Sequence, residues 1–208
     1  YVDKTPFIEG VLAAGAQVVL LPRPRRFGKT VNLSMLRYYL EKSPEDRSAL
    51  FAGLAVASSE LCRTHFQRYP VIFMSFKDVK PLSWEECLAG VANVLGQTYA
   101  EHSYLLGEGK LDPADAKIFS AIRERRAAKS DLLIALGLLS RLLAAHHREK
   151  VVILIDEYDT PIHAGYTRGY YDEVIAFFRD FLSGGLKDNV HLFKGVLTGI
   201  LRVAKESL

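Results

Sequence analysis

The chain has 208 residues, of which 49% are hydrophobic and 25% charged, and its formal net charge is +3. This length and apolar content predict one domain with a full hydrophobic core. The net charge is too small to imply nucleic-acid binding by itself, and no apolar run is long enough for a membrane span. Cys62 and Cys87 lie far apart without metal-ligand spacing, which is typical of unpaired thiols in a reducing compartment. We therefore expect a cytoplasmic protein without membrane segments.

The first half of the chain predicts two strands and the helix between them. Residues 1–9 form a polar and aromatic segment, and residues 17–21 are an apolar run that predicts a strand. Residues 28–41 carry apolar side chains at helical spacing. Residues 71–76 predict the second strand, because a proline precedes an apolar run and proline is tolerated at a strand start.

A long helical region follows. Ser83, with Glu86 three residues later, has the pattern of a capping box and predicts a helix that continues to about residue 100. Two more helices are expected at residues 115–128 and 132–147. We interpret residues 84–148 as a helical crossover or insertion within a single domain that spans residues 1–208.

The last part of the chain returns to alternating strands and helices. Residues 151–155 are an unbroken, mostly β-branched run, which predicts a strand buried on both faces. An amphipathic helix is expected at residues 170–182, ended by Gly184 and Gly185. Residues 190–197 predict a fourth strand. This alternation predicts an α/β fold, in which helices cover both faces of a parallel sheet.

Residues 23–30 read Arg-Pro-Arg-Arg-Phe-Gly-Lys-Thr, and they lie between the first predicted strand and helix. Gly28 lets the backbone approach a phosphate, Lys29 supplies a mobile positive charge, and Thr30 offers a hydroxyl to Mg²⁺. The N–H groups of the new helix point at the same anion. The common G-x-x-x-x-G-K-[ST] pattern has glycine where this chain has Arg23, so the tripeptide alone also fits a helix start with a surface lysine.

A second motif strengthens this interpretation. Asp156 and Glu157 follow the buried strand at residues 151–155, at the edge where parallel sheets bind ligands. An aspartate there can hold Mg²⁺ through its water shell, and a glutamate can polarise an attacking water. The alternative is a strand end with two solvated acids. Both motifs in this order predict a nucleotide site.

Other polar residues follow the predicted strands. Thr198, at the end of the fourth strand, can contact a γ-phosphate or the attacking water, or simply cap a helix. Asp78 follows the second strand and is a weaker candidate for a place near Mg²⁺. The sequence does not assign the roles of the arginines around the loop and after the fourth strand, which are Arg23, Arg25, Arg26 and Arg202.

Several stretches resemble one family. They are Tyr-Val-Asp-Lys-Thr at residues 1–5, the loop at residues 23–30, Ile-Asp-Glu-Tyr-Asp-Thr-Pro-Ile at residues 155–162, and residues 194–207. These resemble the AAA-ATPase-like domain of bacterial proteins that often carry a PD-(D/E)xK nuclease-like domain behind it. The Arg-Pro-Arg-Arg-Phe-Gly-Lys-Thr loop is itself typical of that family. The resemblance implies a P-loop NTPase fold with strand order 5-1-4-3-2.

The resemblance also implies ATP and Mg²⁺ as ligands and a role for each site residue. Residues 1–7 are expected near the adenine. The expected nucleotide-binding residues are Arg26, Phe27, Gly28, Lys29, Thr30 and Val31. The expected metal-binding residues are Thr30 and Asp156, and the expected catalytic residues are Glu157 as base, Lys29 and Thr198 as sensor.

The leading function predicted from the sequence is Mg²⁺-dependent ATP hydrolysis that drives a conformational switch. The alternatives are a slow or non-hydrolysing nucleotide-dependent interaction module, and a DNA-processing ATPase. The oligomeric state, the source of any arginine finger and a nucleic-acid partner stay open. We expect the chain to be part of a longer protein that supplies a fifth strand and a possible nuclease-like domain, so that residues 17–21 form an apolar sheet edge.

Overall fold

The computed structural model, which describes residues 2–24, 26–107 and 111–200, contains one parallel sheet. Its strands run in the order β1-β4-β3-β2, and all neighbouring pairs are parallel. Their bounds are β1 (Val18–Pro22), β2 (Val71–Ser75), β3 (Val151–Asp156) and β4 (Leu192–Gly199). The α/β class and the relative order of strands 1 to 4 are confirmed. Among the described residues, β1 is an edge strand that is only half-buried.

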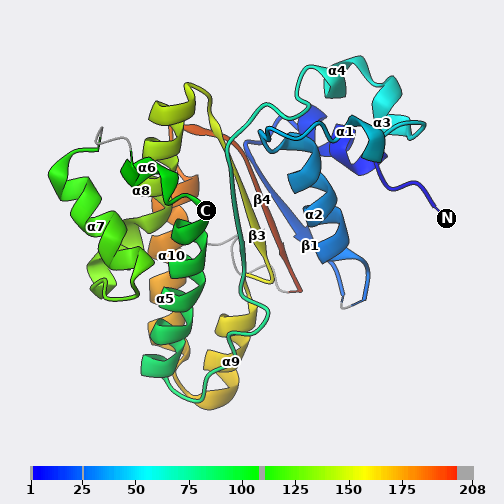
Figure 1. Ribbon diagram of the computed structural model, residues 1–208. Helices are drawn as coiled ribbons and strands as arrows, with labels where there is room; N and C mark the ends of the chain where they lie inside the picture. Colours follow the sequence, from blue (N-terminus) through cyan, green and yellow to red (C-terminus); the bar gives the residue numbers. More distant parts are fainter. Residues whose placement is uncertain (1, 25, 108–110, 201–208) are drawn as a thin grey trace.

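Helices cover both faces of the sheet (Figure 1). Alternate residues of β3 point to opposite faces, so Val152 and Leu154 belong to one core and Ile153 and Ile155 to the other. The first core includes α1 (Pro6–Ala13), α2 (Lys29–Leu40), α3 (Ala55–Ser58) and α4 (Glu60–Arg63). The second includes α5 (Trp84–Glu101), α6 (Tyr104–Gly107), α7 (Pro113–Arg123), α8 (Lys129–His147), α9 (Thr160–Arg168) and α10 (Tyr171–Leu186).

The capping box predicted at the start of α5 is formed in part, because its return bond comes from Leu82, one residue before the N-cap Ser83. The hydroxyl of Ser83 accepts a hydrogen bond from the Glu86 N–H at 3.3 Å, and the Glu86 carboxylate accepts one from the Leu82 N–H at 2.9 Å. A short 3₁₀ helix, Ser48–Leu50, lies between α2 and α3. Within the described part of the chain, no helix is both long and apolar enough to cross a membrane.

Two predicted helix ends need correction. The helix expected at residues 115–128 is α7, which ends at Arg123. α10 runs through Gly184 and Gly185 to Leu186, so the expected end at residue 182 is wrong. A Cβ atom on Gly185 would lie 2.4 Å from Cβ of Leu136 in α8. Gly185 therefore permits close packing of α8 and α10, and neither glycine ends the helix. The sequence patterns also did not reveal two short helices, α1 before β1 and α9 after the acidic pair.

The close approach of α8 and α10 predicts opposite effects for two helical glycines. Gly185→Ala should destabilise the protein by about 1–3 kcal/mol, because the added methyl overpacks the contact with Leu136. Gly10→Ala in α1 should stabilise it by about 0.5–1 kcal/mol, because nothing lies within 4 Å of its Cβ position and alanine favours a helix. Urea unfolding midpoints measure both changes. Equal midpoints for Gly185→Ala and the parent would contradict the packing argument.

Candidate functional site

The loop between β1 and α2 has the backbone of an anion-binding turn. Gly28 is the N-cap of α2 and has a left-handed backbone with φ 71°, and its carbonyl accepts a hydrogen bond from the Asn32 N–H at 2.9 Å. Arg26 is also left-handed, with φ 67°. Left-handed residues in a turn direct neighbouring N–H groups toward a common point, where an anion can bind. Among the described loop residues, Arg23 does not have a positive φ, so this position does not require glycine.

Lys29 is held inside this loop. Its side chain is buried, with 7% of the residue exposed, and its ammonium donates to the carbonyl oxygens of Arg23 at 2.7 Å and Pro24 at 3.2 Å. An ammonium has three hydrogens, so one donor remains for a phosphate oxygen. The Arg23 N–H in turn donates to the Gly199 carbonyl at 3.0 Å, which ties the loop to the end of β4.

Asp156 joins three parts of the fold at the carboxyl edge of the sheet. It is fully buried, and one carboxylate oxygen accepts a hydrogen bond from the Thr30 hydroxyl at 2.8 Å. The other accepts a short hydrogen bond from the Thr198 hydroxyl. The structure therefore brings together the predicted metal-binding pair, Thr30 and Asp156, and places Thr198 beside them.

These oxygens fit a hydrated Mg²⁺ ion. Mg²⁺ prefers oxygen ligands, keeps several waters and usually takes only one or two protein groups together with substrate phosphates. Thr30 and Asp156 supply such a hydroxyl and carboxylate. Within the described residues there is no group of three or more histidine, cysteine or acidic side chains that could hold a metal ion. The site thus suits a metal that arrives with phosphates better than a resident ion in a protein cage.

Thr198 forms hydrogen bonds with both Asp156 and Glu157. Besides donating to Asp156, its hydroxyl accepts a hydrogen bond from the Glu157 N–H at 3.2 Å, and its carbonyl accepts one from the Tyr158 N–H at 3.1 Å. The residue is fully buried. Because its single hydroxyl hydrogen is directed at Asp156, Thr198 acts here as a positioning residue. The expected contact with a γ-phosphate stays a prediction.

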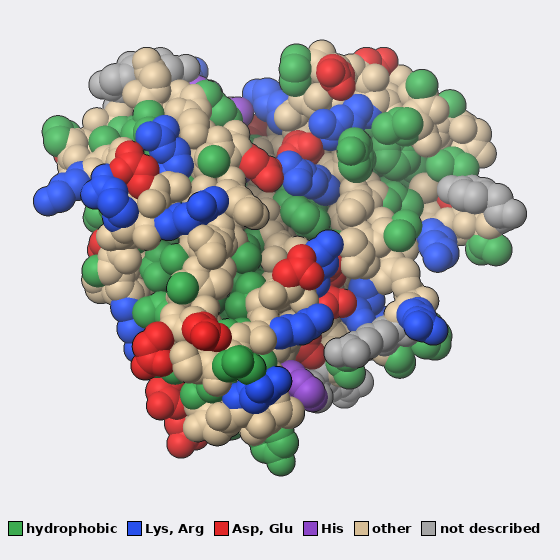
Figure 2. All heavy atoms as spheres, turned by 60° about the horizontal axis from the view of Figure 1, so that its bottom comes forward, with side chains coloured by type: hydrophobic (Ala, Val, Ile, Leu, Met, Phe, Trp, Pro, Cys, Tyr) green, Lys and Arg blue, Asp and Glu red, His purple; other side chains and the backbone are tan. Residues whose placement is uncertain are grey.

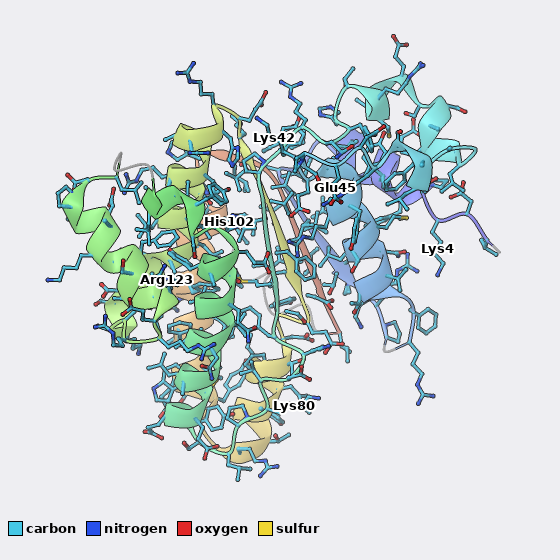
Figure 3. All side chains as sticks on the ribbon, in the orientation of Figure 1. Lys4, Lys42, Glu45, Lys80, His102 and Arg123 are labelled. Atoms are coloured by element: carbon cyan, nitrogen blue, oxygen red, sulfur yellow. The ribbon has the colours of Figure 1, made fainter. Side chains whose placement is uncertain are left out.

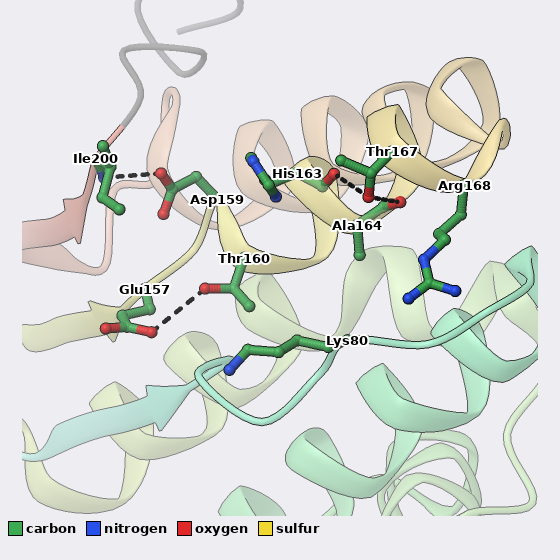
Figure 4. A pocket seen from close by; sticks show the side chains of 9 residues that line it. All are labelled: Lys80, Glu157, Asp159, Thr160, His163, Ala164, Thr167, Arg168 and Ile200. Carbon is green, nitrogen blue, oxygen red and sulfur yellow. Dashed lines mark hydrogen bonds between the residues drawn. The ribbon is translucent and has the colours of Figure 1, made fainter. Parts of the chain in front are cut away.

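Glu157 has an unusual backbone for a non-glycine residue. Its φ is 50°, in the left-handed region, and its carboxylate accepts a hydrogen bond from the Thr160 hydroxyl at 3.3 Å. The Asp159 carboxylate accepts a hydrogen bond from the Ile200 N–H at 2.7 Å and so links the segments that follow β3 and β4. Figure 4 shows both bonds at one end of a pocket.

This pocket has a volume of about 540 Å³. It is lined by Lys80, Glu157, Asp159, Thr160, His163, Ala164, Thr167, Arg168 and Ile200. None of the described residues of the phosphate loop lines it, so it reaches Glu157 from the side of α9. Figure 2 is turned so that the lower end of Figure 1 comes forward. Acidic and basic side chains are interspersed on the face that it shows.

The remaining candidates lie outside the hydrogen-bonded group of Thr30, Asp156, Thr198 and Glu157. Arg26, Phe27 and Val31 are exposed around the loop, where 61% of Phe27 and 62% of Val31 is accessible to solvent. The Asp78 side chain is 86% exposed and lines a different pocket. Arg25 and Arg202 lie outside the described residues. The residue patterns gave no individual role to four residues, which are Lys4, Lys80, Thr160 and Arg168.

Comparisons with known proteins show the family of the chain. A family described as "Predicted AAA-ATPase" matches residues 1–208. An "Uncharacterized protein in vnfD 5'region" of Azotobacter chroococcum mcd 1 is 30% identical over 213 residues, which cover 100% of this chain and 35% of that protein. The chain therefore spans about a third of the length of this relative. No solved structure matches this chain. The chain belongs to the AAA-ATPase-like family, the family of predicted AAA-ATPases.

Proposed function

We propose that this domain binds ATP together with Mg²⁺, hydrolyses it between the phosphate loop and the end of β3, and uses the reaction to drive a conformational switch in a longer cytoplasmic protein. One observation carries the proposal. The buried Asp156 carboxylate accepts hydrogen bonds from Thr30 of the phosphate loop and from Thr198 of β4, directly before Glu157. This arrangement joins the phosphate-binding groups to a candidate base.

The phosphate loop supplies the binding interactions. N–H groups at the start of α2 and the Lys29 ammonium would bind the β- and γ-phosphates, flanked by Arg26, Phe27 and Val31. Thr30 and Asp156 would hold Mg²⁺, which when bound neutralises charge on those phosphates.

Glu157 is the proposed general base. In hydrolysis, a water oxygen attacks the γ-phosphorus, the bond to the bridging oxygen breaks, and ADP leaves. The Glu157 carboxylate orients that water and accepts its proton. The left-handed backbone and the bond from Thr160 restrict the position of the carboxylate, and the pocket beside α9 gives access to it. Thr198 fixes the backbone of Glu157 relative to Asp156.

Two hydrogen bonds support a switch. The Arg23 N–H bonds to Gly199 at the end of β4, and the next residue, Ile200, bonds to Asp159 before α9. A change at the phosphate loop would therefore be transmitted through the end of β4 to α9, which packs against α10. These bonds provide a short mechanical connection from the nucleotide to the helical layer.

Removal of the Lys29 ammonium should weaken ATP binding at least about tenfold, because a hydrogen bond to a charged group is worth about 1.5–3 kcal/mol. We expect this from Lys29→Ala in the full-length protein, titrated with a fluorescent ATP analogue. Lys117→Ala in α7, away from the site, is the matched control and should bind like the parent. If Lys29→Ala also binds like the parent, the phosphate-loop assignment fails.

Glu157→Gln should keep ATP bound but slow hydrolysis by about 10²–10⁴, because glutamine cannot accept the water proton. Phosphate release by the full-length protein measures this, with EDTA to test the need for Mg²⁺ and with DNA to test for stimulation. Asp172→Asn, which changes an exposed acid of α10, is the control. A parent rate in Glu157→Gln would place the base elsewhere, with Asp159 as the next candidate. Tight binding without turnover in the parent would favour the interaction module.

Thr198→Val should reduce both stability and kcat, whereas Thr198→Ser should preserve both. Valine leaves the buried Asp156 carboxylate and the Glu157 N–H each short of one partner, which costs about 1–3 kcal/mol. Urea unfolding reports the stability, and turnover at saturating ATP reports the alignment of Glu157. A valine variant that is less stable but keeps the parent kcat would show that Thr198 supports only the fold.

A further inference from the structure

The segment before α1 is anchored at two of its residues. The Asp3 carboxylate accepts hydrogen bonds from the N–H groups of Thr5 and Ala55, both at 2.8 Å. These N–H groups, with that of Ala55 the larger cause, lower the pKa of Asp3, so its carboxyl is ionised at neutral pH. The Thr5 hydroxyl is buried and accepts a hydrogen bond from the Val56 N–H at 3.1 Å. Residues 2–5, the N-terminal strap, are thereby fixed to the first turn of α3.

Lys4 lies between the two anchors, and its ammonium lies against the phosphate loop. A Cβ atom built on Gly28 would be 3.2 Å from Lys4 Nζ. Figure 3 labels Lys4 on the strap, on the same side of the sheet as α2. Within the described part of the chain, the Lys4 ammonium has no hydrogen bond and no salt bridge, and the residue is exposed to solvent. Its charge is therefore available to an anion at the loop.

The two lysines of the loop region differ in what restrains them. Two loop carbonyls hold the Lys29 ammonium inside the turn. The Lys4 ammonium comes from the strap, outside the turn, and lies beside Gly28, where a Cβ atom would crowd the ammonium. Two positive charges, one held within the turn and one beside Gly28, are then available to one anion site. Such a clamp strengthens binding mainly in proportion to the charge of the ligand.

We propose that Lys4 is a second lysine ligand for the phosphates of the nucleotide, positioned by the strap through Asp3 and Thr5. This inference rests on the proposed function, because it names a further ligand at the same site. It differs from the expectation that residues 1–7 lie near the adenine, because the ammonium contacts the loop residue that approaches phosphate. Binding of a nucleotide would then also tie the strap, and with it α1, to the loop.

The test compares Lys4→Ala with Lys4→Arg in the full-length protein. Lys4→Ala should weaken ATP binding by about 2- to 5-fold, the upper part of the range for a solvent-exposed charge pair. Lys4→Arg should retain most of the affinity, and Lys117→Ala should bind like the parent. Competition against a fluorescent ATP analogue should show that ADP is also weakened, while adenosine is unaffected. The loss for ATP should shrink as salt is raised.

A double-mutant cycle tests the role of the strap. Asp3→Ala removes the anchor, so it should weaken ATP binding by an amount similar to Lys4→Ala, and the double variant should be no weaker than Lys4→Ala alone. Fully additive losses would show that Asp3 does not act through Lys4.

Three outcomes would overturn the inference or its basis. If Lys4→Ala binds ATP like the parent while Lys29→Ala binds it weakly, the role of Lys4 is refuted and the proposed function is not. An equal loss for adenosine and ATP would place Lys4 at the base instead of the phosphates. Parent-like ATP binding by both lysine variants would refute the proposed function itself.

Discussion

The organisation of the site depends on one buried charge. Asp156 has no exposed surface, and a buried carboxylate costs several kcal/mol unless hydrogen bonds replace its water. The hydroxyls of Thr30 and Thr198 supply those bonds from α2 and β4. The loop, the central strand and its neighbour are therefore held together at a single carboxylate. Because Thr198 also accepts the Glu157 N–H, the position of Glu157 follows from the same interaction.

The parallel sheet provides the frame in which this contact forms. β4 lies between β1 and β3, so its end is adjacent both to the residue that begins the loop and to the acidic pair. Gly199 makes this proximity possible, because a Cβ there would lie 2.7 Å from Oδ1 of Asp159 and 2.8 Å from the Tyr158 ring. The backbone of β4 thus touches the segment after β3 on one side and Arg23 on the other.

Residue patterns could predict the parts of the structure that depend on local chemistry. The apolar run before Asp156 predicts a buried strand, and Gly-Lys-Thr after a strand predicts an anion-binding helix start. Long-range packing determines the rest. Gly184 and Gly185 are typical of a helix end, yet α10 continues through both, and α8 lies so close that α10 needs glycine at Gly185. No local pattern could show that Lys4 reaches Gly28, because this depends on the bonds between Asp3 and α3.

The backbone conformation explains why the loop has Arg23 where the common pattern has its first glycine. Arg23 needs no such conformation, whereas Gly28 and Arg26 do. Left-handed geometry costs roughly 1–2 kcal/mol for a residue with a Cβ, so Arg26 and Glu157 both hold strain. One lies in the phosphate loop and the other follows the Mg²⁺-compatible aspartate. Strained residues persist where the surrounding structure determines their position, and the hydrogen bond from the Glu157 N–H to Thr198 does so for Glu157. Of the six described non-glycine residues with a positive φ, these two are the ones that would lie beside the phosphates and the attacking water.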